Sequence, residues 1–503
     1  MRIKITALFC LLSGFVIGQS QDSIALKYAN TITANEMSTH LHVIASDEYQ
    51  GRETGKEGQK MAMEFLVNYF KKTGFEPVEN YGYVQQFPLV EQMAEGISLS
   101  INNKKFQFFD DFFSFPSITP SANFNTSIVF GGFGISELKW DDYKNVDLTN
   151  KIVLLLDGVP SKVSLEKEWT IKDKIDLAKK KGAKAIFVTV KDYDTYVKRY
   201  DHYIKKAKMD LKSNMEEEGF VPVYRVNDKI KEEILSTNGV KEKKYLKGKS
   251  IKQKQFAKAN LVIEKETNEF FGENVLAYIE GTEKPDELII VTAHYDHIGA
   301  EGDVVFNGAD DDGSGTVALM ELAQAFKMAS EQGNGPKRSI LFMPVSGEEK
   351  GLLGSEYYSK NPVFPLEQTV ANLNVDMIGR LDEAHEGNPN FVYLIGSDKL
   401  SSDLHQISEN ANETYTKLEL DYTFNDENDP NRFYYRSDHY NFAKNGIPVI
   451  FYFCGVHEDY HKETDTVDKI DFNKMETITK LIFHTAWDLA NRPERIIVDG
   501  DNK

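Results

Sequence analysis

Four short apolar runs in the second half of the chain end in residues of the kinds that bind metal ions. The runs are ELIIVTAHYD, RSILFMPVSGEE, ANLNVDMIG and IPVIFYFCGVHEDYH, and helix-like stretches separate them. Runs of this length and spacing are typical of buried parallel strands, and open α/β sheets place their sites beyond the carboxyl ends of such strands. The pattern predicts an α/β fold with a mostly parallel or mixed central sheet and helices on both faces.

The candidate ligands at these strand ends are His294, Asp376, the pair Glu348 and Glu349, and His457 and His461, with the loop GADDDGSG at residues 308–315 adding a carboxylate cluster. A catalytic zinc takes three protein ligands and keeps one position for water, so this set exceeds the needs of a single ion. Two ions about 3.5 to 4 Å apart need a bridging carboxylate and ligands on each side. The residues therefore predict a hydrolase with two zinc ions.

Five motifs occur in a fixed order along the chain: TAHYDHIG, GADDDGSG, PVSGEEKGLLGS, NVDMIG and DYHKETDT. In that order they resemble the co-catalytic zinc aminopeptidases of metallopeptidase family 28, and the resemblance extends to residues 41–75. It implies that His294 and Asp376 bind one zinc ion and that Glu349 and His461 bind the other. It also implies that Asp311 bridges the two ions. Of three consecutive aspartates, Asp311 has the spacing from the serine of the motif that the family pattern requires.

Three residues are expected to have catalytic roles, Glu348 and Tyr460 from the resemblance and Asp296 from its spacing. Glu348 is expected to act as the general base, taking a proton from the zinc-bridging water and passing it to the leaving amine. Asp296, two residues after His294, is suited to hold the second nitrogen of that imidazole. Tyr460 resembles a family tyrosine whose hydroxyl stabilises the oxyanion. An ordinary turn aspartate and a core tyrosine are the alternative interpretations of Asp296 and Tyr460.

Two local features qualify this assignment. His457 and His461 fit the pattern H-E-x-x-H, which binds zinc only on a helix. Here the pattern follows an apolar strand and Gly455 and leads into threonine-rich sequence, so we expect no helix and no role of the thermolysin type.

Ser314 is expected to cap a helix whose apolar stripe includes Val317 and Phe326.

A chain of 503 residues exceeds the size of a single core, roughly 250 to 300 residues, so at least two domains are expected. Residues 96–258 differ in texture from the rest and resemble the protease-associated domain often inserted into this family. The peptidase domain then consists of residues 21–95 and residues 259–503. ANLVIEKE at residues 259–266 and ENVLAYIEG are expected to resume its sheet.

Residues 1–20 have a basic start, an apolar centre and small residues near Ser20, which predicts a secretory signal peptide and export to a periplasm or the medium. Without them the chain has 57 basic and 78 acidic residues, a formal charge of −21, and one cysteine. This acidity argues against nucleic acid or an anionic membrane as a partner. Peptide substrates are the expected partners.

Several alternatives stay open from the sequence. Arg380, Arg432 and Arg436 could form a cluster that selects C-terminal acidic residues, as in glutamate carboxypeptidase, although ordinary ion pairs are the better interpretation. Residues 424–442 are expected to form a lid over a pocket lined by Phe433, Tyr434 and Tyr435. The acidic part of the lid could hold Ca²⁺, although a solvated loop is the better interpretation. A glutaminyl cyclase with one zinc ion and a non-catalytic binding protein on the same fold are the remaining functional alternatives.

Overall fold

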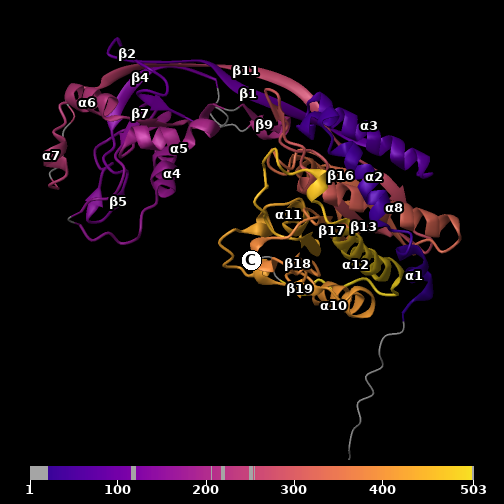
Figure 1. Cartoon of the computed structure of the whole chain (residues 1–503). Helices are drawn as coiled ribbons and strands as arrows, with labels where there is room; N and C mark the ends of the chain where they lie inside the picture. Colours follow the sequence, from indigo (N-terminus) through magenta and orange to yellow (C-terminus); the bar gives the residue numbers. More distant parts are fainter. Residues whose placement is uncertain are drawn as a thin grey trace, which may run out of the picture. The chain divides into compact units, whose positions relative to one another are not determined.

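The computed structural model describes residues 21–114, 121–161, 163–205, 207–216, 221–248, 253 and 255–500 (Figure 1). The predicted signal peptide, residues 1–20, lies outside the described residues. The chain forms two compact units, one from Met1–Phe87 together with Gly272–Lys503 and one from Pro88–Phe271. We refer to them as the site unit and the inserted unit. The site unit contains all the candidate ligands.

A mixed sheet of seven described strands forms the centre of the site unit, in the order β12-β16-β13-β17-β20-β18-β19. Its strands are β12 (Ala277–Ile279), β13 (Lys284–His294), β16 (Arg338–Val345), β17 (Thr369–Val375), β18 (Phe391–Ile395), β19 (Glu419–Asp421) and β20 (Val449–Phe453). Every residue of β16 and β17 is buried. Burial on both faces explains why most residues of these runs are apolar rather than alternating with polar ones.

The four strands that end in candidate ligands are neighbours in this sheet. β13 pairs in parallel with β16 and with β17, and β17 pairs in parallel with β20. Their carboxyl ends therefore meet at one edge of the sheet, as the sequence predicts. The strands β12 and β18 pair antiparallel with β16 and β20, respectively, so the sheet is mixed.

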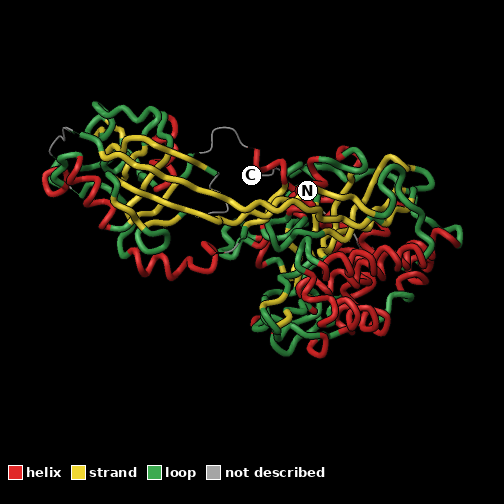
Figure 2. The backbone as a smooth tube through the Cα atoms, turned by 90° about the horizontal axis from the view of Figure 1, so that it is seen from above, coloured by secondary structure: helices red, strands yellow, loops and turns green. Residues whose placement is uncertain are grey.

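Helices α8 and α12 pack against each other and against β16, whereas α11 packs against β17, β20 and α9. Figure 2 shows the helices of the site unit gathered against its strands. The helices of this unit are α1 (Ser23–Ala29), α2 (Ala34–Ile44), α3 (Glu57–Lys72), α8 (Gly315–Glu331), α9 (Leu353–Lys360), α10 (Ser402–Ala411), α11 (His439–Ala443) and α12 (Phe472–Asn491). Two short strands, β14 (Ala300–Glu301) and β15 (Val304–Val305), form a hairpin.

The predicted apolar stripe of α8 is only part of its buried surface. Apart from Gln324, every residue from Gly315 to Phe326 is buried, because the helix lies among the sheet, α2 and α12. The capping prediction for Ser314 is wrong. Its hydroxyl donates to the carbonyl oxygen of Asp310 across 2.8 Å, and Asp312 Oδ1 accepts the hydrogen bond from Gly315 N instead. The serine already has helical backbone angles, which turn its side chain away from the free N–H groups.

The inserted unit is built on a nine-stranded sheet in the described chain, in the order β2-β1-β11-β4-β7-β8-β10-β3, with β9 pairing β1. Its strands are β1 (Val84–Ile101), β2 (Lys104–Phe106), β3 (Phe112–Phe113), β4 (Ala122–Phe130), β7 (Ile152–Leu155), β8 (Ala185–Thr189), β9 (Lys208–Leu211), β10 (Val223–Val226) and β11 (Ala257–Val275), with a hairpin of β5 (Ser136–Glu137) and β6 (Trp140–Asp141). Its helices are α4 (Ile171–Lys180), α5 (Tyr193–Lys205), α6 (Asp228–Thr237) and α7 (Glu242–Tyr245).

The strands β1 and β11 continue through the boundaries between the two units, so both junctions lie within strands. The compact inserted unit is Pro88–Phe271, whereas the change in sequence texture placed it at 96–258. Residues 259–263 of ANLVIEKE pair with β4 of the inserted unit, so the expectation that they resume the main sheet is wrong. Alternating polarity identifies a strand but does not specify its partner. The identity of the inserted unit as a protease-associated domain stays a prediction.

None of the described helices combines the length and the apolar character that a bilayer crossing requires.

Candidate metal centre

The first group of candidate ligands surrounds the ring of His294, the last residue of β13. Its Nε2 lies 3.3 Å from Asp311 Oδ1 and 3.7 Å from Asp376 Oδ1. Asp376 directly follows β17, the neighbouring parallel strand. All three residues are buried, and their ligand atoms lie close enough together to hold one ion.

A second group lies on the other side of Asp311. His461 Nε2 is 3.0 Å from Asp311 Oδ2 and 3.3 Å from Glu349 Oε2. The two oxygens of Asp311 therefore face two different sets of ligands. This arrangement suits a carboxylate that bridges two ions.

The other two aspartates of the triplet point elsewhere. Asp310 Oδ1 accepts a hydrogen bond from Gly379 N across 2.6 Å. Asp312 accepts from the backbone N–H groups of His294 and Met377, each across 3.1 Å. Both side chains fasten the loop to neighbouring strand ends, which leaves Asp311 to face the ligands.

The charges of this centre suit a divalent cation. Asp311 Oδ2 and Glu349 Oε1 are buried without a hydrogen-bond partner in the described chain. Burial lowers the pKa of His461, but the charges and contacts of Asp311 and Glu349 raise it overall to about 10. Carboxylates that draw protons onto a histidine in this way also attract a metal ion, which competes for the same nitrogen. The donors, two histidines and three carboxylates, fit zinc.

Glu348 lies beside this centre with its carboxylate next to the first ligand group. Its Oε2 is 3.9 Å from His294 Nε2, and its side chain is 12% exposed. Burial raises the pKa of Glu348 well above that of an ordinary carboxyl, and the charges of Glu349 and Asp376 add to the rise. The adjacent residue, Glu349, contacts His461 instead. Glu349 therefore lies among the ligands, whereas the carboxylate of Glu348 is free to exchange a proton.

Asp296 supports His294 in a different way from the one expected. His294 Nδ1 lies 3.0 Å from the backbone carbonyl oxygen of Asp296, whereas the nearest carboxylate oxygen is 3.9 Å away. The carboxylate itself accepts from the hydroxyl of Thr54 across 2.6 Å and from Glu348 N across 3.3 Å. The backbone carbonyl of Asp296, and not its carboxylate, contacts the imidazole of His294. The carboxylate is therefore free to bind the backbone N–H of Glu348.

Tyr460 stands at the mouth of the centre. It lines a small hollow of about 30 Å³ together with Glu348 and a larger one of about 580 Å³ beside it. The two hollows share Tyr460, Phe433, Arg436 and Val456. Burial and the nearby carboxylates raise the pKa of Tyr460, so its hydroxyl keeps its proton and can donate it in a hydrogen bond.

The pattern H-E-x-x-H is not helical, as expected. The residues from His457 to His461 form a turn, and the two histidines have different neighbours. His457 Nε2 lies 3.3 Å from Asp310 Oδ2, away from the ligand groups, and Glu458 is exposed.

Sequence reasoning missed four residues that shape the centre. Arg52 is fully buried and donates to the carbonyl oxygen of Gly308, and Ser437 donates to Asp376 Oδ2 across 2.6 Å. Asp438 lies near Glu348, and burial raises its pKa to about 7. His297 lies 2.9 Å from Glu349 through Nδ1. Only His297 had a signal in the sequence, as a further histidine in the same strand-end motif.

The three arginines do not form a cluster. Arg380 pairs with Asp459 across 2.9 Å, and Arg432 stacks on Tyr435. Arg436 alone lines the hollows. Of the three aromatic residues expected to line a pocket under the lid, only Phe433 does so, because Tyr434 packs into the core and Tyr435 is 37% exposed.

In the acidic part of the predicted lid, the aspartate carboxylates accept hydrogen bonds from the backbone of the same segment. Asp426 Oδ1 accepts from Asn428 N across 2.7 Å, and the two oxygens of Asp429 accept from Asn431 N and Phe433 N. Asx turns of this kind need no cation. The possible Ca²⁺ site stays a prediction.

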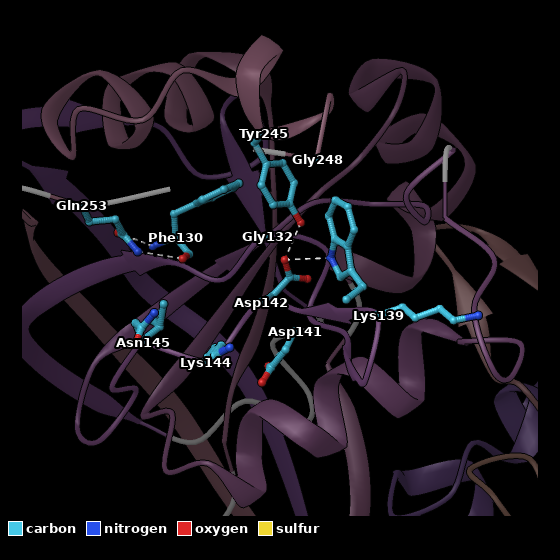
Figure 3. Close-up of a pocket in the computed structure, with 12 residues that line it drawn as sticks. Phe130, Gly132, Lys139, Asp141, Asp142, Lys144, Asn145, Tyr245, Gly248 and Gln253 are labelled. Carbon is cyan, nitrogen blue, oxygen red and sulfur yellow. Dashed lines mark hydrogen bonds between the residues drawn. The ribbon is translucent and has the colours of Figure 1, made fainter. Parts of the chain in front are cut away.

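The inserted unit has a hollow of its own, of about 390 Å³ (Figure 3). Figure 3 shows the Tyr245 hydroxyl pointing at the Asp142 carboxylate, and their hydrogen bond is 2.7 Å long. The other oxygen of Asp142 accepts from the backbone N–H groups of Phe133 and Ile135. Burial raises the pKa of Asp142 to about 6. The chain itself satisfies this carboxylate, which makes it a structural centre of the hollow.

Residues 274–486 match the family model described as "Peptidase family M28". A protein named "Probable zinc metalloprotease" from Pyrenophora tritici-repentis (strain Pt-1C-BFP) is 30% identical over 263 residues, covering 44% of this chain and 52% of the relative. A "Probable leucine aminopeptidase" from Arthroderma otae (strain ATCC MYA-4605 / CBS 113480) is 32% identical over 226 residues, covering 43% and 57%. The chain spans about half the length of these curated relatives.

Two solved structures share the fold. An aminopeptidase from Aneurinibacillus sp. strain AM-1 aligns with a TM-score of 0.56 at 18% identity, covering 95% of this chain and 98% of its own. A zinc aminopeptidase from Bacillus subtilis aligns with a TM-score of 0.50 at 18% identity, covering 93% and 99%. These similarities agree with the fold described above. Residues 274–486 form a domain of peptidase family M28.

Proposed function

We propose that this protein is an exported aminopeptidase with two zinc ions, which hydrolyses the first peptide bond of its peptide substrates. The observation that carries the proposal is the position of Asp311, whose two carboxylate oxygens face His294 and His461 separately. The family domain and the printed names of the relatives support the same activity. His294, Asp311 and Asp376 would hold one ion, and Asp311, Glu349 and His461 the other.

Zinc ions bound at these positions would polarise the substrate carbonyl and lower the pKa of the attacking water. The carboxylate of Glu348, which faces His294, then takes the proton that the water releases. It delivers this proton to the amide nitrogen as the peptide bond breaks. Asp296 holds the backbone of Glu348 in place through the hydrogen bond at 3.3 Å. Tyr460 donates its hydroxyl hydrogen to the carbonyl oxygen as negative charge develops there.

The walls of the hollow favour a substrate with an apolar first residue. Besides the ligands, Glu348, Tyr460 and Arg436, they consist of apolar side chains, namely Met377, Phe433, Phe451, Phe453 and Val456. Burial of apolar side-chain surface against such walls is worth roughly 25 cal/mol per Å². We therefore expect leucine-like and phenylalanine-like residues to be removed faster than charged ones.

The decisive experiment is an assay of the zinc-loaded protein on aminoacyl anilides, C-terminal dipeptides and peptides that begin with glutamine. The proposal expects release of the amino-terminal residue, with activity lost on chelation and restored by Zn²⁺. Cyclisation of the glutamine peptide without hydrolysis would instead support the glutaminyl cyclase alternative. Cleavage confined to the C-terminal bond would support the carboxypeptidase, and binding without turnover would support the non-catalytic alternative.

Export is a separate part of the proposal. It rests on the basic, apolar and small-residue segments of residues 1–20. Expression of the full-length gene product followed by N-terminal sequencing of the extracellular or periplasmic material tests it. A mature chain that still begins at Met1 would contradict it.

A further inference from the structure

His297 is a buried histidine that no step of the proposed reaction uses. It lies three residues after His294, in the segment that follows β13, and is 0% exposed. Its Nδ1 lies 2.9 Å from Glu349 Oε1 and 3.8 Å from Asp311 Oδ2. These three atoms are buried, and none has a hydrogen-bond partner among the described residues. Buried polar atoms without partners are rare in native proteins. A bound ligand would satisfy all three of these atoms.

The surroundings of His297 hold its ring in place. A Cβ atom on Gly308 would lie 2.5 Å from the ring atoms Cγ and Cδ2, so only glycine leaves room for the ring. The backbone N–H of His297 donates to the carbonyl oxygen of Arg52 across 3.2 Å. The imidazole therefore cannot easily turn away from the two carboxylates.

His297 and His461 approach the same two carboxylates from different sides. Glu349 presents Oε1 to His297 and Oε2 to His461, and the rings of the two histidines pack edge to face with their centroids 5.8 Å apart. Donor atoms on one tetrahedral zinc lie roughly 3.3 Å apart, given bonds of about 2.0 to 2.1 Å. The contacts of 2.9 to 3.8 Å around Glu349 and Asp311 bracket that value.

We propose that His297 is a fourth protein ligand of the second ion, together with Asp311, Glu349 and His461. The proposal rests on the two-metal centre of the proposed function. It makes the two positions unequal, because the first has three protein ligands and keeps a position for water, whereas the second has four protein ligands. His297 is also buried, whereas the His461 side chain is 37% exposed. The second position should therefore fill first and release its ion last.

Metal-binding measurements on three variants test the proposal. Wild-type protein, His297→Ala, His297→Asn and His461→Ala would be stripped with a chelator and dialysed against buffered Zn²⁺. The proposal expects the wild type to bind two ions per chain, and both His297 variants to bind one of them at least tenfold more weakly. The asparagine variant keeps an N–H donor near the place of Nδ1 but offers a poor zinc ligand. If it binds zinc as the wild type does, His297 is only a hydrogen-bond donor and the proposal is overturned.

X-ray absorption of the fully loaded wild type gives an answer that does not depend on how the variants fold. Three imidazoles shared by two zinc ions are expected, and a count of two would reject the proposal. Melting curves of the metal-free variants separate lost affinity from lost structure. The proposed function fails separately, if protein that binds both ions hydrolyses no peptide.

Discussion

Arg52 Nη2 donates a hydrogen bond to the carbonyl oxygen of Gly308 across 2.9 Å, at the start of the loop that carries Asp311. The same guanidinium also reaches the carbonyl oxygens of Ile44, Tyr295 and Asn307, each within 2.8 Å. Burial lowers the pKa of Arg52 to about 10, so the group stays charged at neutral pH. One buried side chain from the N-terminal segment thus fixes both the loop of Asp311 and the turn after His294.

Replacement of Arg52 should therefore destabilise the protein. The change Arg52→Gln removes most of four hydrogen bonds from a charged donor, each worth roughly 1.5 to 3 kcal/mol. We expect the free energy of unfolding, from urea titration, to fall by at least about 3 kcal/mol. Arg199→Gln, at an exposed position of the inserted unit, is the matched control. An unchanged urea midpoint for Arg52→Gln would contradict the role given to this residue.

Replacement of the general base should remove turnover and leave the metal in place. For Glu348→Gln we expect kcat to fall by roughly a hundredfold or more, because proton transfer is lost while the ligands are kept. Glu458→Gln, which changes the exposed glutamate of the H-E-x-x-H pattern, should change kcat little. Steady-state kinetics and zinc content per chain are the measurements. The reverse ranking of the two variants would mean that the base has been assigned to the wrong glutamate.

Ser437 should tune the affinity of the first metal position. Its hydroxyl donates to Asp376 Oδ2 across 2.6 Å and accepts from Asn374 Nδ2 across 2.8 Å. Loss of a partner that orients a ligand typically costs about 10- to 100-fold in metal affinity. We expect a loss of this size at one of the two sites for Ser437→Ala, measured by competition with a chelating dye. Ser359→Ala on α9, where the hydroxyl bonds only the helix backbone, is the comparison and should bind both ions normally.

The stability of the fold should fall with rising pH in part because of Glu321 on α8. Burial, together with the charges of Glu36 and Glu476, raises its pKa from 4.5 to about 8. The folded state therefore binds a proton that the unfolded state lacks between these two values, and stability falls across that window as pH rises. Below pH 4.5 the group contributes no penalty, and above about pH 8 the penalty is complete.

The change Glu321→Gln should remove this penalty. We expect the variant and the wild type to be equally stable near pH 4 and the variant to be more stable by about 2 to 4 kcal/mol at pH 9. Urea unfolding at a series of pH values measures the difference. Parallel curves for the two proteins over the whole range would show that Glu321 does not titrate in this window.

Removal of the metal should destabilise the site unit. Without cations, the carboxylates of Asp311, Glu348, Glu349 and Asp376 face one another in a buried space. Ions that bind only the folded state stabilise it by about 2.7 kcal/mol at a free concentration one hundred times the dissociation constant. Chelation should lower the melting temperature, and Zn²⁺ should restore it. Asp311→Asn, which weakens both positions, should show a smaller shift.

The strand ends explain how much of the site the sequence predicted. His294, Asp376 and the Glu348–Glu349 pair each follow an apolar run, and the carboxyl ends of parallel strands meet at one edge whatever the details of packing. The resemblance to a known family then selected Asp311 and His461, and the structure brings both to the same centre. Asp311 lies in an irregular helical segment, Ala309–Ser314, and His461 lies in a turn. The pattern of apolar positions describes neither.

The sequence by itself determined the α/β class, the strands that carry ligands and the kinds of side chain at their ends, because periodicity and polarity are local properties of the chain. Only the tertiary structure decided that the backbone of Asp296 supports His294, that Arg52 fixes the loop of Asp311, and that His297 turns toward Glu349. These contacts join segments or orient side chains through packing against distant residues. Their geometry depends on that packing, which no local pattern of residues encodes.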